Sequence, residues 1–252
     1  MSEMIQSVAP NQMVPSEREL IAPLWHTFLL VLLILGVSAT SYFLTRRFVS
    51  SGRMPGEARL IIYLVALVEE WGLAAYVYLA MRGRGVTVRK AINAGWFNAR
   101  TVRRDIRIAV IVSAGFLAIE GLGSVVFRGQ LATVSRMLEQ LTPHTVLELL
   151  VWIVLSISAG FCEEFIFRGY LQEQCRRITG SGAAGVTIQA LVFGAGHGYQ
   201  GWAMMVTIFF IGLFFGGVVA WRKSLAPTMI THGAADTIGG VGSFLGHVMH
   251  RM

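Results

Sequence analysis

The sequence predicts an all-α membrane protein, a polytopic helical bundle with its functional site inside the bundle. Of its 252 residues, 54% are hydrophobic and 14% are charged, whereas a soluble domain has about 25% charged residues. Apolar runs of about 20 residues, the length that spans a hydrocarbon core, recur along the chain. No internal repeat and no Pro- or Ser-rich linker interrupts them. We therefore expect a polar segment over residues 1–20 and a single transmembrane domain over residues 21–252.

Seven helical spans follow from the apolar runs. They cover residues 22–45, 60–81, 108–127, 145–175, 183–200, 202–221 and 225–247. Ser16-Glu17-Arg18-Glu19 has the pattern of a capping box, which predicts that the first helix begins near Ser16. The fourth run is longer than a bilayer requires. We expect it to leave the membrane as an amphipathic extension through Gln172 and Gln174.

Short connections and small residues predict how the later spans pack. The fifth and sixth runs are separated by little more than Tyr199-Gln200-Gly201, which indicates a tight hairpin. Gly212 and Gly216 in the sixth run have the four-residue spacing of small residues that lets helices approach closely. We expect these two glycines to serve packing only.

The charge distribution predicts orientation and argues against a nucleic-acid binder. The net charge is +7, and nineteen of the twenty-one basic residues are arginine. They lie mostly in loops between apolar runs, not on one soluble face. Eight fall between the second and third runs, which places this loop and the amino terminus in the cytoplasm and the carboxyl terminus outside. Four arginines after the first run contradict that pattern, and an additional or re-entrant segment there would raise the number of spans to eight. They are Arg46, Arg47, Arg53 and Arg59.

Two adjacent carboxylates and a guanidinium lie in the apolar fourth run, at Glu163, Glu164 and Arg168. An ionisable residue within a membrane segment is unfavourable by about 2.5–3.5 kcal/mol, so it needs a partner, a watery cavity or a function. On a helix Glu164 and Arg168 are four residues apart and share one face, which predicts a structural ion pair. Glu163 points away from both and is left to face a cavity.

Histidines in two later runs can reach the same depth as Glu163. His197 ends the fifth run between glycines, and His232 lies four residues before Asp236 on one helical face. At about 1.5 Å of rise per residue, Glu163, His197 and His232 can meet in the inner half or the middle of the membrane. We expect a buried aqueous site that faces the cytoplasm.

Together these residues resemble the three motifs of the CPBP intramembrane proteases. The matching patterns are Glu-Glu-x-x-x-Arg at 163–168, Phe-x-x-x-His at 193–197 and His-x-x-x-Asx at 232–236, in that order. The family contains the Ras-converting CAAX prenyl endopeptidase and the bacterial Abi-type proteins. The resemblance covers residues 145–245, and nothing before residue 140 contributes to it.

The resemblance implies a glutamic-type endopeptidase that needs no cofactor. It would hydrolyse a peptide bond in a membrane-associated protein or peptide, lipidated or not, by means of an activated water. Glu163 would be the general base, and His197 would help to position and deprotonate the water. His232 and Asp236 would lie where the family stabilises the oxyanion. Its bacterial members suggest a multi-pass protein of the bacterial cytoplasmic membrane, with no nucleic-acid partner.

The remaining motif residues are expected to support the site. By the same resemblance, Glu164 and Arg168 would hold the helix and its charge in place, and Phe193 belongs to the second motif. The family commonly has Asn where this chain has Asp236. An ionised carboxylate would repel an oxyanion, so Asp236 must be protonated or must orient and charge His232.

Two other interpretations are open at this point. Two histidines and a carboxylate can hold a catalytic zinc, although the compact His-Glu-x-x-His pattern is absent. Glu69, Glu70 and Glu120 lie within the second and third runs, which suits a transporter, although no pair of matching halves is evident. We expect these three carboxylates to pair with arginines or to stay protonated. A silent membrane scaffold or immunity protein is a further non-enzymatic alternative.

Overall fold

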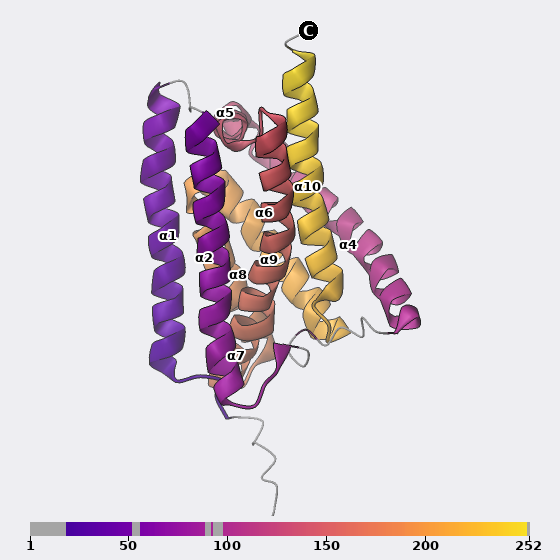
Figure 1. Cartoon of the computed structure of the whole chain (residues 1–252). Helices are drawn as coiled ribbons and strands as arrows, with labels where there is room; N and C mark the ends of the chain where they lie inside the picture. Colours follow the sequence, from indigo (N-terminus) through magenta and orange to yellow (C-terminus); the bar gives the residue numbers. More distant parts are fainter. Residues whose placement is uncertain (1–18, 52–55, 89–91, 93–97, 251–252) are drawn as a thin grey trace, which may run out of the picture.

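The computed structural model describes residues 19–51, 56–88, 92 and 98–250, which form an all-α bundle without strands in that part of the chain (Figure 1). The predicted fold class is confirmed. The long helices are α1 (Leu24–Ser51), α2 (Gly56–Gly83), α4 (Ala99–Val126), α6 (Val146–Glu164), α9 (Trp202–Arg222) and α10 (Ala226–Met249). The shorter elements are η1 (Arg128–Gln130), α5 (Leu131–Leu141), η2 (Phe165–Leu171), α7 (Gln172–Thr179), α8 (Gly182–Gly196) and η3 (Gly198–Gln200).

Each predicted apolar run coincides with a helical segment, so the chain is a multi-pass integral membrane protein. Five segments among the described residues are long and apolar enough to cross a membrane: Leu24–Phe43, Gly56–Gly83, Ala99–Val126, Val146–Thr179 and Trp202–Arg222. Helix α8 is apolar but has only 15 residues, and the 24-residue α10 completes the set. Helix α1 begins at one end of the bundle and α10 finishes at the other (Figure 1).

The first helix begins later than its capping pattern predicts. Helix α1 starts at Leu24, so the expected start near Ser16 is wrong, and Ser16 itself lies outside the described residues. Pro23 disfavours a helical conformation at Ala22. The backbone N–H groups of Ile21 and Ala22 instead approach Gln174 Oε1, at 2.8 and 3.4 Å. This segment is therefore held against α7.

The fourth span is not one regular helix. Between α6 and α7 the chain forms a seven-residue π-helix, η2. Both glutamines expected on an amphipathic extension are buried, so that expectation is wrong. Gln172 Nε2 donates to the carbonyl of Gly216 on α9 at 3.1 Å, and Gln174 Nε2 donates to the carbonyl of Ala22 at 2.7 Å. The glutamines bind neighbouring segments in place of solvent.

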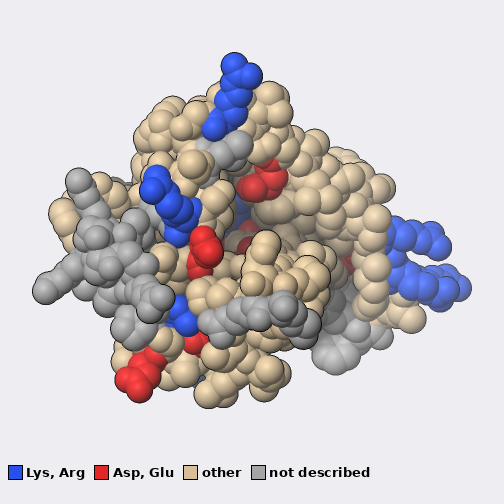
Figure 2. Space-filling view, turned by 90° about the horizontal axis from the view of Figure 1, so that it is seen from above, with Lys and Arg blue, Asp and Glu red and all other residues tan. Residues whose placement is uncertain are grey.

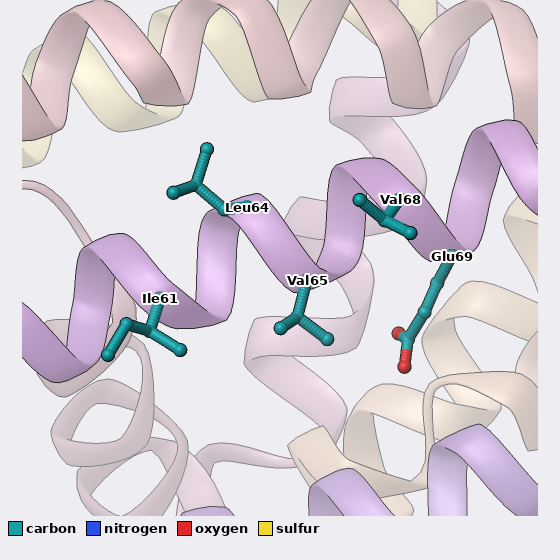
Figure 3. Close-up of a pocket in the computed structure, with 5 residues that line it drawn as sticks. All are labelled: Ile61, Leu64, Val65, Val68 and Glu69. Atoms are coloured by element: carbon teal, nitrogen blue, oxygen red, sulfur yellow. The ribbon is translucent and has the colours of Figure 1, made fainter.

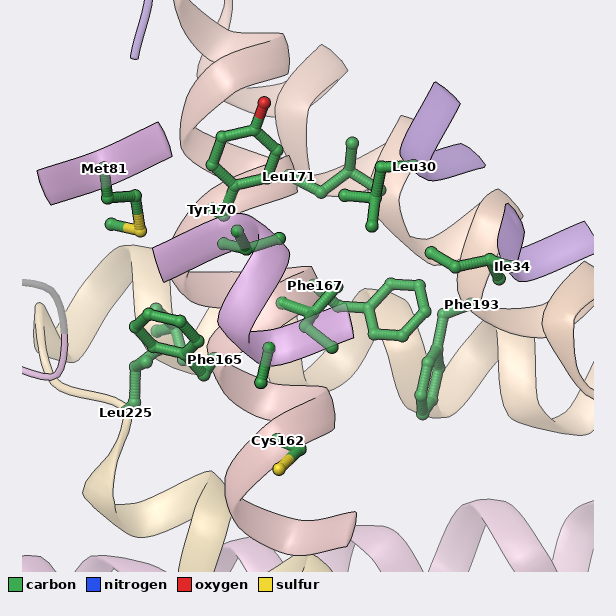
Figure 4. Packing of buried hydrophobic residues seen from close by; sticks show 14 of the residues in the cluster. Leu30, Ile34, Met81, Cys162, Phe165, Phe167, Tyr170, Leu171, Phe193 and Leu225 are labelled. Atoms are coloured by element: carbon green, nitrogen blue, oxygen red, sulfur yellow. The ribbon is translucent and has the colours of Figure 1, made fainter. Parts of the chain in front are cut away.

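Side chains of η2 lie at the centre of the bundle. Phe165, Phe167, Tyr170 and Leu171 are buried, and η2 lies among residues of α1, α2 and α8 and of the turn before α10 (Figure 4). Phe167 packs edge-on against Phe193 of α8, with ring centroids 4.9 Å apart. π-turns are rare and often mark functional sites. Here the π-helix directly follows the two adjacent carboxylates.

Glycines set the helix separations around the site. A Cβ atom on Gly212 would lie 3.0 Å from Ala190 of α8, and one on Gly216 would lie 2.6 Å from Gln189 Nε2. The packing role expected for these two glycines is confirmed. The tight turn expected between the fifth and sixth spans is η3, followed by Gly201 at φ 92°, a conformation that favours glycine.

Replacing Gly160 by alanine is expected to destabilise the protein. A Cβ atom there would meet backbone atoms of α10, at 2.6 Å from Gly233 N and 2.9 Å from Met229 O. Because backbone cannot move aside as a flexible side chain can, we expect the free energy of unfolding to fall by about 1–3 kcal/mol. Thermal unfolding in detergent measures this. Gly239→Ala on α10 is the control, since its Cβ meets nothing within 4 Å, and equal melting of the two variants would contradict the packing argument.

Candidate active site

Glu163, the last residue but one of α6, lies beside histidines from two other helices. Its Oε2 is 4.0 Å from His197 Nε2 and 3.8 Å from His232 Nε2. His197 follows the last residue of α8, and His232 lies in the second turn of α10. The structure thus brings together three residues that are far apart in the sequence, as the depth argument predicts.

Glu164 and Arg168 form the expected ion pair. Arg168 Nη1 donates to Glu164 Oε1 at 2.9 Å, and neither side chain has any exposed surface. The guanidinium carbon of Arg168 lies 4.1 Å from the ring centroid of Phe193 and 5.4 Å from that of Phe215. The pair is therefore sealed between aromatic rings, which is a favourable environment for a desolvated cation.

Glu164 also contacts the site, a role that the helical-face argument missed. Its Oε1 lies 3.2 Å from His232 Nδ1. The two adjacent glutamates thus approach opposite nitrogens of one imidazole, Glu164 at Nδ1 and Glu163 at Nε2. Because the carboxylate of Glu164 accepts, His232 Nδ1 carries the hydrogen and donates. Glu164 therefore links the ion pair to the orientation of His232.

The orientation of His197 is fixed by backbone. Its Nδ1 lies 2.8 Å from the carbonyl oxygen of Phe193, one helical turn earlier. A carbonyl only accepts, so Nδ1 donates, and in the neutral imidazole Nε2 keeps its lone pair. This lone pair is on the side of Glu163. The Phe193 ring packs edge-on against the His197 ring at 4.8 Å, so Phe193 supports the histidine through both its backbone and its side chain.

Asp236 lies at the edge of the group. Its Oδ2 is 3.5 Å from His232 Nε2, and its side chain is 40% exposed, compared with 20% for Glu163 and 0% for Glu164. The helix that carries it is held by Trp152 of α6, whose Nε1 donates to the backbone carbonyl of Asp236 at 2.9 Å. Exposure thus separates an accessible set of polar groups from the sealed ion pair beneath it.

The end of the bundle at which α10 finishes is hollowed near its middle, and acidic side chains are visible there (Figure 2). This end is opposite to the loop between α2 and α4 (Figure 1). A substrate that entered from this end would approach from the side that the arginine distribution assigns to the exterior. The cytoplasmic access expected from the sequence stays a prediction.

Glu70 of α2 faces the same group, which the sequence gave no reason to expect. Its electrostatic neighbours are Glu163, His232, Asp236 and Glu69, and its Oε2 is buried without a hydrogen-bond partner among the described residues. The next residue, Trp71, donates from Nε1 to Ser158 Oγ of α6 at 3.2 Å, which fixes α2 beside the site. An arginine partner for Glu70 is thus not what the structure shows.

The two other membrane carboxylates lie differently. Glu69 lies with Ile61, Leu64, Val65 and Val68 along a groove of about 280 Å³ on α2 (Figure 3). Glu120 of α4 has Asp236 as an electrostatic neighbour. The sequence offers no motif for Glu70 or Glu120, because only the packing of α2 and α4 brings them near the site.

Metal-binding geometry was searched among the described residues. No group of three or more His, Cys, Asp and Glu side chains in that part of the chain is arranged to hold a metal ion. The two imidazole Nε2 atoms and the Glu163 carboxylate are instead spaced about a bridging hydrogen-bonded molecule apart, at 3.8–4.0 Å.

Comparison with protein families supports the motif assignment. Residues 145–238 match a family model described as type II CAAX prenyl endopeptidase Rce1-like. The matched segment runs from the N-cap of α6 to α10 and contains all of the predicted motif residues. It supports a CAAX-type membrane endopeptidase in general. Comparison with curated proteins and with solved structures gives no match.

Proposed function

We propose that this chain, whose residues 145–238 carry an Rce1-like domain, is a glutamic-type intramembrane endopeptidase. It would hydrolyse a peptide bond in a membrane-associated protein or peptide. The observation that carries the proposal is the convergence of Glu163 Oε2 with the Nε2 atoms of His197 and His232, at 4.0 and 3.8 Å. These are a carboxylate and two imidazoles, the groups used for general acid–base catalysis.

Glu163 and His197 are placed to activate a water molecule. Two acceptors 4.0 Å apart can both lie within about 2.8 Å of one water oxygen, the usual hydrogen-bond distance. The water would attack the carbonyl carbon of the substrate and transfer a proton to Glu163. Collapse of the tetrahedral intermediate breaks the C–N bond, and the same proton then passes to the leaving amine. His197 Nε2 holds the water in line because its Nδ1 is committed to backbone.

His232 is the candidate oxyanion donor. Its Nδ1 donates to Glu164, so a second proton on Nε2 would make the ring an imidazolium with Nε2–H on the side of the reacting group. Carboxylates near an imidazole favour the charged form. Asp236 Oδ2 at 3.5 Å from Nε2 suits the second role expected for it, which is to orient and charge His232. The developing negative charge would then meet a preorganised donor.

Substrate and location are proposed at a coarser level. The substrate would be a protein or peptide held at the bilayer, with or without a lipid anchor, and the membrane would be the bacterial cytoplasmic membrane. Hydrolysis leaves a chemical mark that identifies it without knowledge of the substrate. Purified protein incubated with solubilised membrane proteins in ¹⁸O-water should generate new peptide carboxyl groups that carry ¹⁸O. A transporter or scaffold would generate none.

Metal chelation separates the glutamate mechanism from a zinc mechanism. We expect hydrolysis to survive prolonged treatment with a strong chelator, because Glu163 and His197 activate the water themselves. The measurement is the rate of ¹⁸O-carboxyl formation before and after chelation, with elemental analysis of the same sample. Loss of activity that added zinc restores would replace the glutamate mechanism by metal-activated water.

A further inference from the structure

A second cavity lies away from the site, where α7 ends, α8 begins and the chain turns from α9 into α10 (Figure 1). Its volume is about 350 Å³. One part of its lining is aliphatic and includes Met81, Val86 and Val219. The other part is polar and basic. None of the residues used in the proposed hydrolysis by direct contact lines it.

The basic lining carries an excess of positive charge. Arg176, Arg177 and Lys223 line the cavity together with one carboxylate, Glu173. Arg176 Nε and Arg177 Nε donate to Glu173 at 2.7 and 2.8 Å, so one anion serves two guanidinium groups. Three cations and one carboxylate leave two positive charges in excess. Arg168 also lines the cavity, but its charge is matched by Glu164.

Two helix N-termini add to this field. Gly182, the first residue of α8, lines the cavity, and so does Ser224, two residues before α10. The free N–H groups and dipole at a helix N-terminus favour anions. In this cavity they act together with three cationic side chains. The combination is typical of a phosphate site.

The surroundings indicate the membrane interface. Trp221 is 72% exposed and lies two residues before Lys223, which ends α9 in a left-handed conformation. Exposed tryptophan beside lysine and arginine is characteristic of the headgroup level of a bilayer, and basic pockets between membrane helices bind anionic headgroups. The aliphatic wall offers a surface for the glycerol and acyl part of a lipid.

We propose that this cavity binds the phosphate group of an anionic phospholipid, with Arg176, Arg177 and Lys223 as its cationic contacts. The site is distinct from the proposed peptidase site and does not depend on it. One side chain connects them, because Arg168 lines the cavity and holds Glu164. A bound lipid would therefore stabilise the protein next to the residues that orient His232.

The test is lipid-dependent thermal stabilisation of the purified protein in detergent. Phosphatidylglycerol is expected to raise the melting temperature, and phosphatidylcholine is expected to have little effect. In the variant Arg177→Gln/Lys223→Gln the apparent affinity for phosphatidylglycerol should fall about tenfold or more, as for the loss of two charge contacts. The matched control is Arg103→Gln/Arg104→Gln, which removes two exposed charges of α4 outside the cavity and should leave the affinity unchanged.

A second variant guards against a folding defect. A Cβ atom at Gly182 meets nothing within 4 Å, and a carboxylate at a helix N-terminus is favourable. Gly182→Glu should therefore fold normally and yet lose the phosphatidylglycerol response. Equal responses to both lipids, equal losses in the α4 control, or a full response in Gly182→Glu would each overturn the proposal. Inorganic phosphate that competes at the same concentration as the lipid would reassign the cavity to free phosphate and overturn the lipid assignment.

Discussion

Glu163→Gln is expected to lower the rate of peptide hydrolysis by about 10²–10⁴-fold, the usual contribution of a general base, without changing the melting temperature. The amide keeps the size of the side chain but cannot accept the proton of the attacking water. Glu163 Oε2 has no hydrogen-bond partner among the described residues, and the side chain is 20% exposed. Folding therefore does not depend on its charge.

The control for this variant is Glu69→Gln, which neutralises another membrane carboxylate. Glu69 lines the groove on α2 with aliphatic side chains (Figure 3), so its replacement should leave hydrolysis intact. Initial rates of ¹⁸O-carboxyl formation and melting curves, recorded on the same preparations, measure both properties. Retained turnover in Glu163→Gln would exclude Glu163 as the base. Equal losses in both variants would point to a general effect of membrane charge.

Arg168→Met is expected to lower the free energy of unfolding by about 3–5 kcal/mol, the range observed when one partner of a buried ion pair is removed. Glu164 would remain as a fully buried carboxylate without its counter-ion. The methionine would also lose the contact that the guanidinium makes with the rings of Phe193 and Phe215. Denaturant or thermal unfolding in detergent measures the change.

The double variant Glu164→Gln/Arg168→Met separates charge from packing. Neutral side chains of similar size can replace a buried pair at little loss, and the glutamine carbonyl can still accept from His232 Nδ1. We expect most of the stability lost in Arg168→Met to return. A double variant as unstable as the single one would show that the aromatic packing of Arg168, and not the uncompensated charge of Glu164, is the larger contribution.

The parts of the fold that depend on local pattern could be predicted from the sequence. The length of each apolar run predicts a helix, and the four-residue spacing of Glu164 and Arg168 predicts their ion pair. The ordered motifs place Glu163, His197 and His232 in one site, and the structure brings them within 4.0 Å of one another at the Glu163 carboxylate. Each of these predictions uses only spacing along one segment or the order of segments.

Features that depend on tertiary contact could not be predicted. The π-helix η2 looks like ordinary helix in the sequence, and the burial of Gln172 and Gln174 depends on partners in α9 and before α1. The contact between Glu164 and His232 joins residues 68 positions apart. Glu70 is drawn to the site by the packing of Trp71 on α6. Such contacts require knowledge of which helices are neighbours.

The central claim is that Glu163 makes this chain a membrane peptidase, and a comparison of membrane proteomes tests it most directly. Cells that produce the wild-type protein and cells that produce Glu163→Ala at the same level would be compared for protein termini near membrane segments. The account predicts a set of membrane-proximal cleavage products that is present with the wild type and absent with the variant. Identical sets of termini in the two membranes would contradict it.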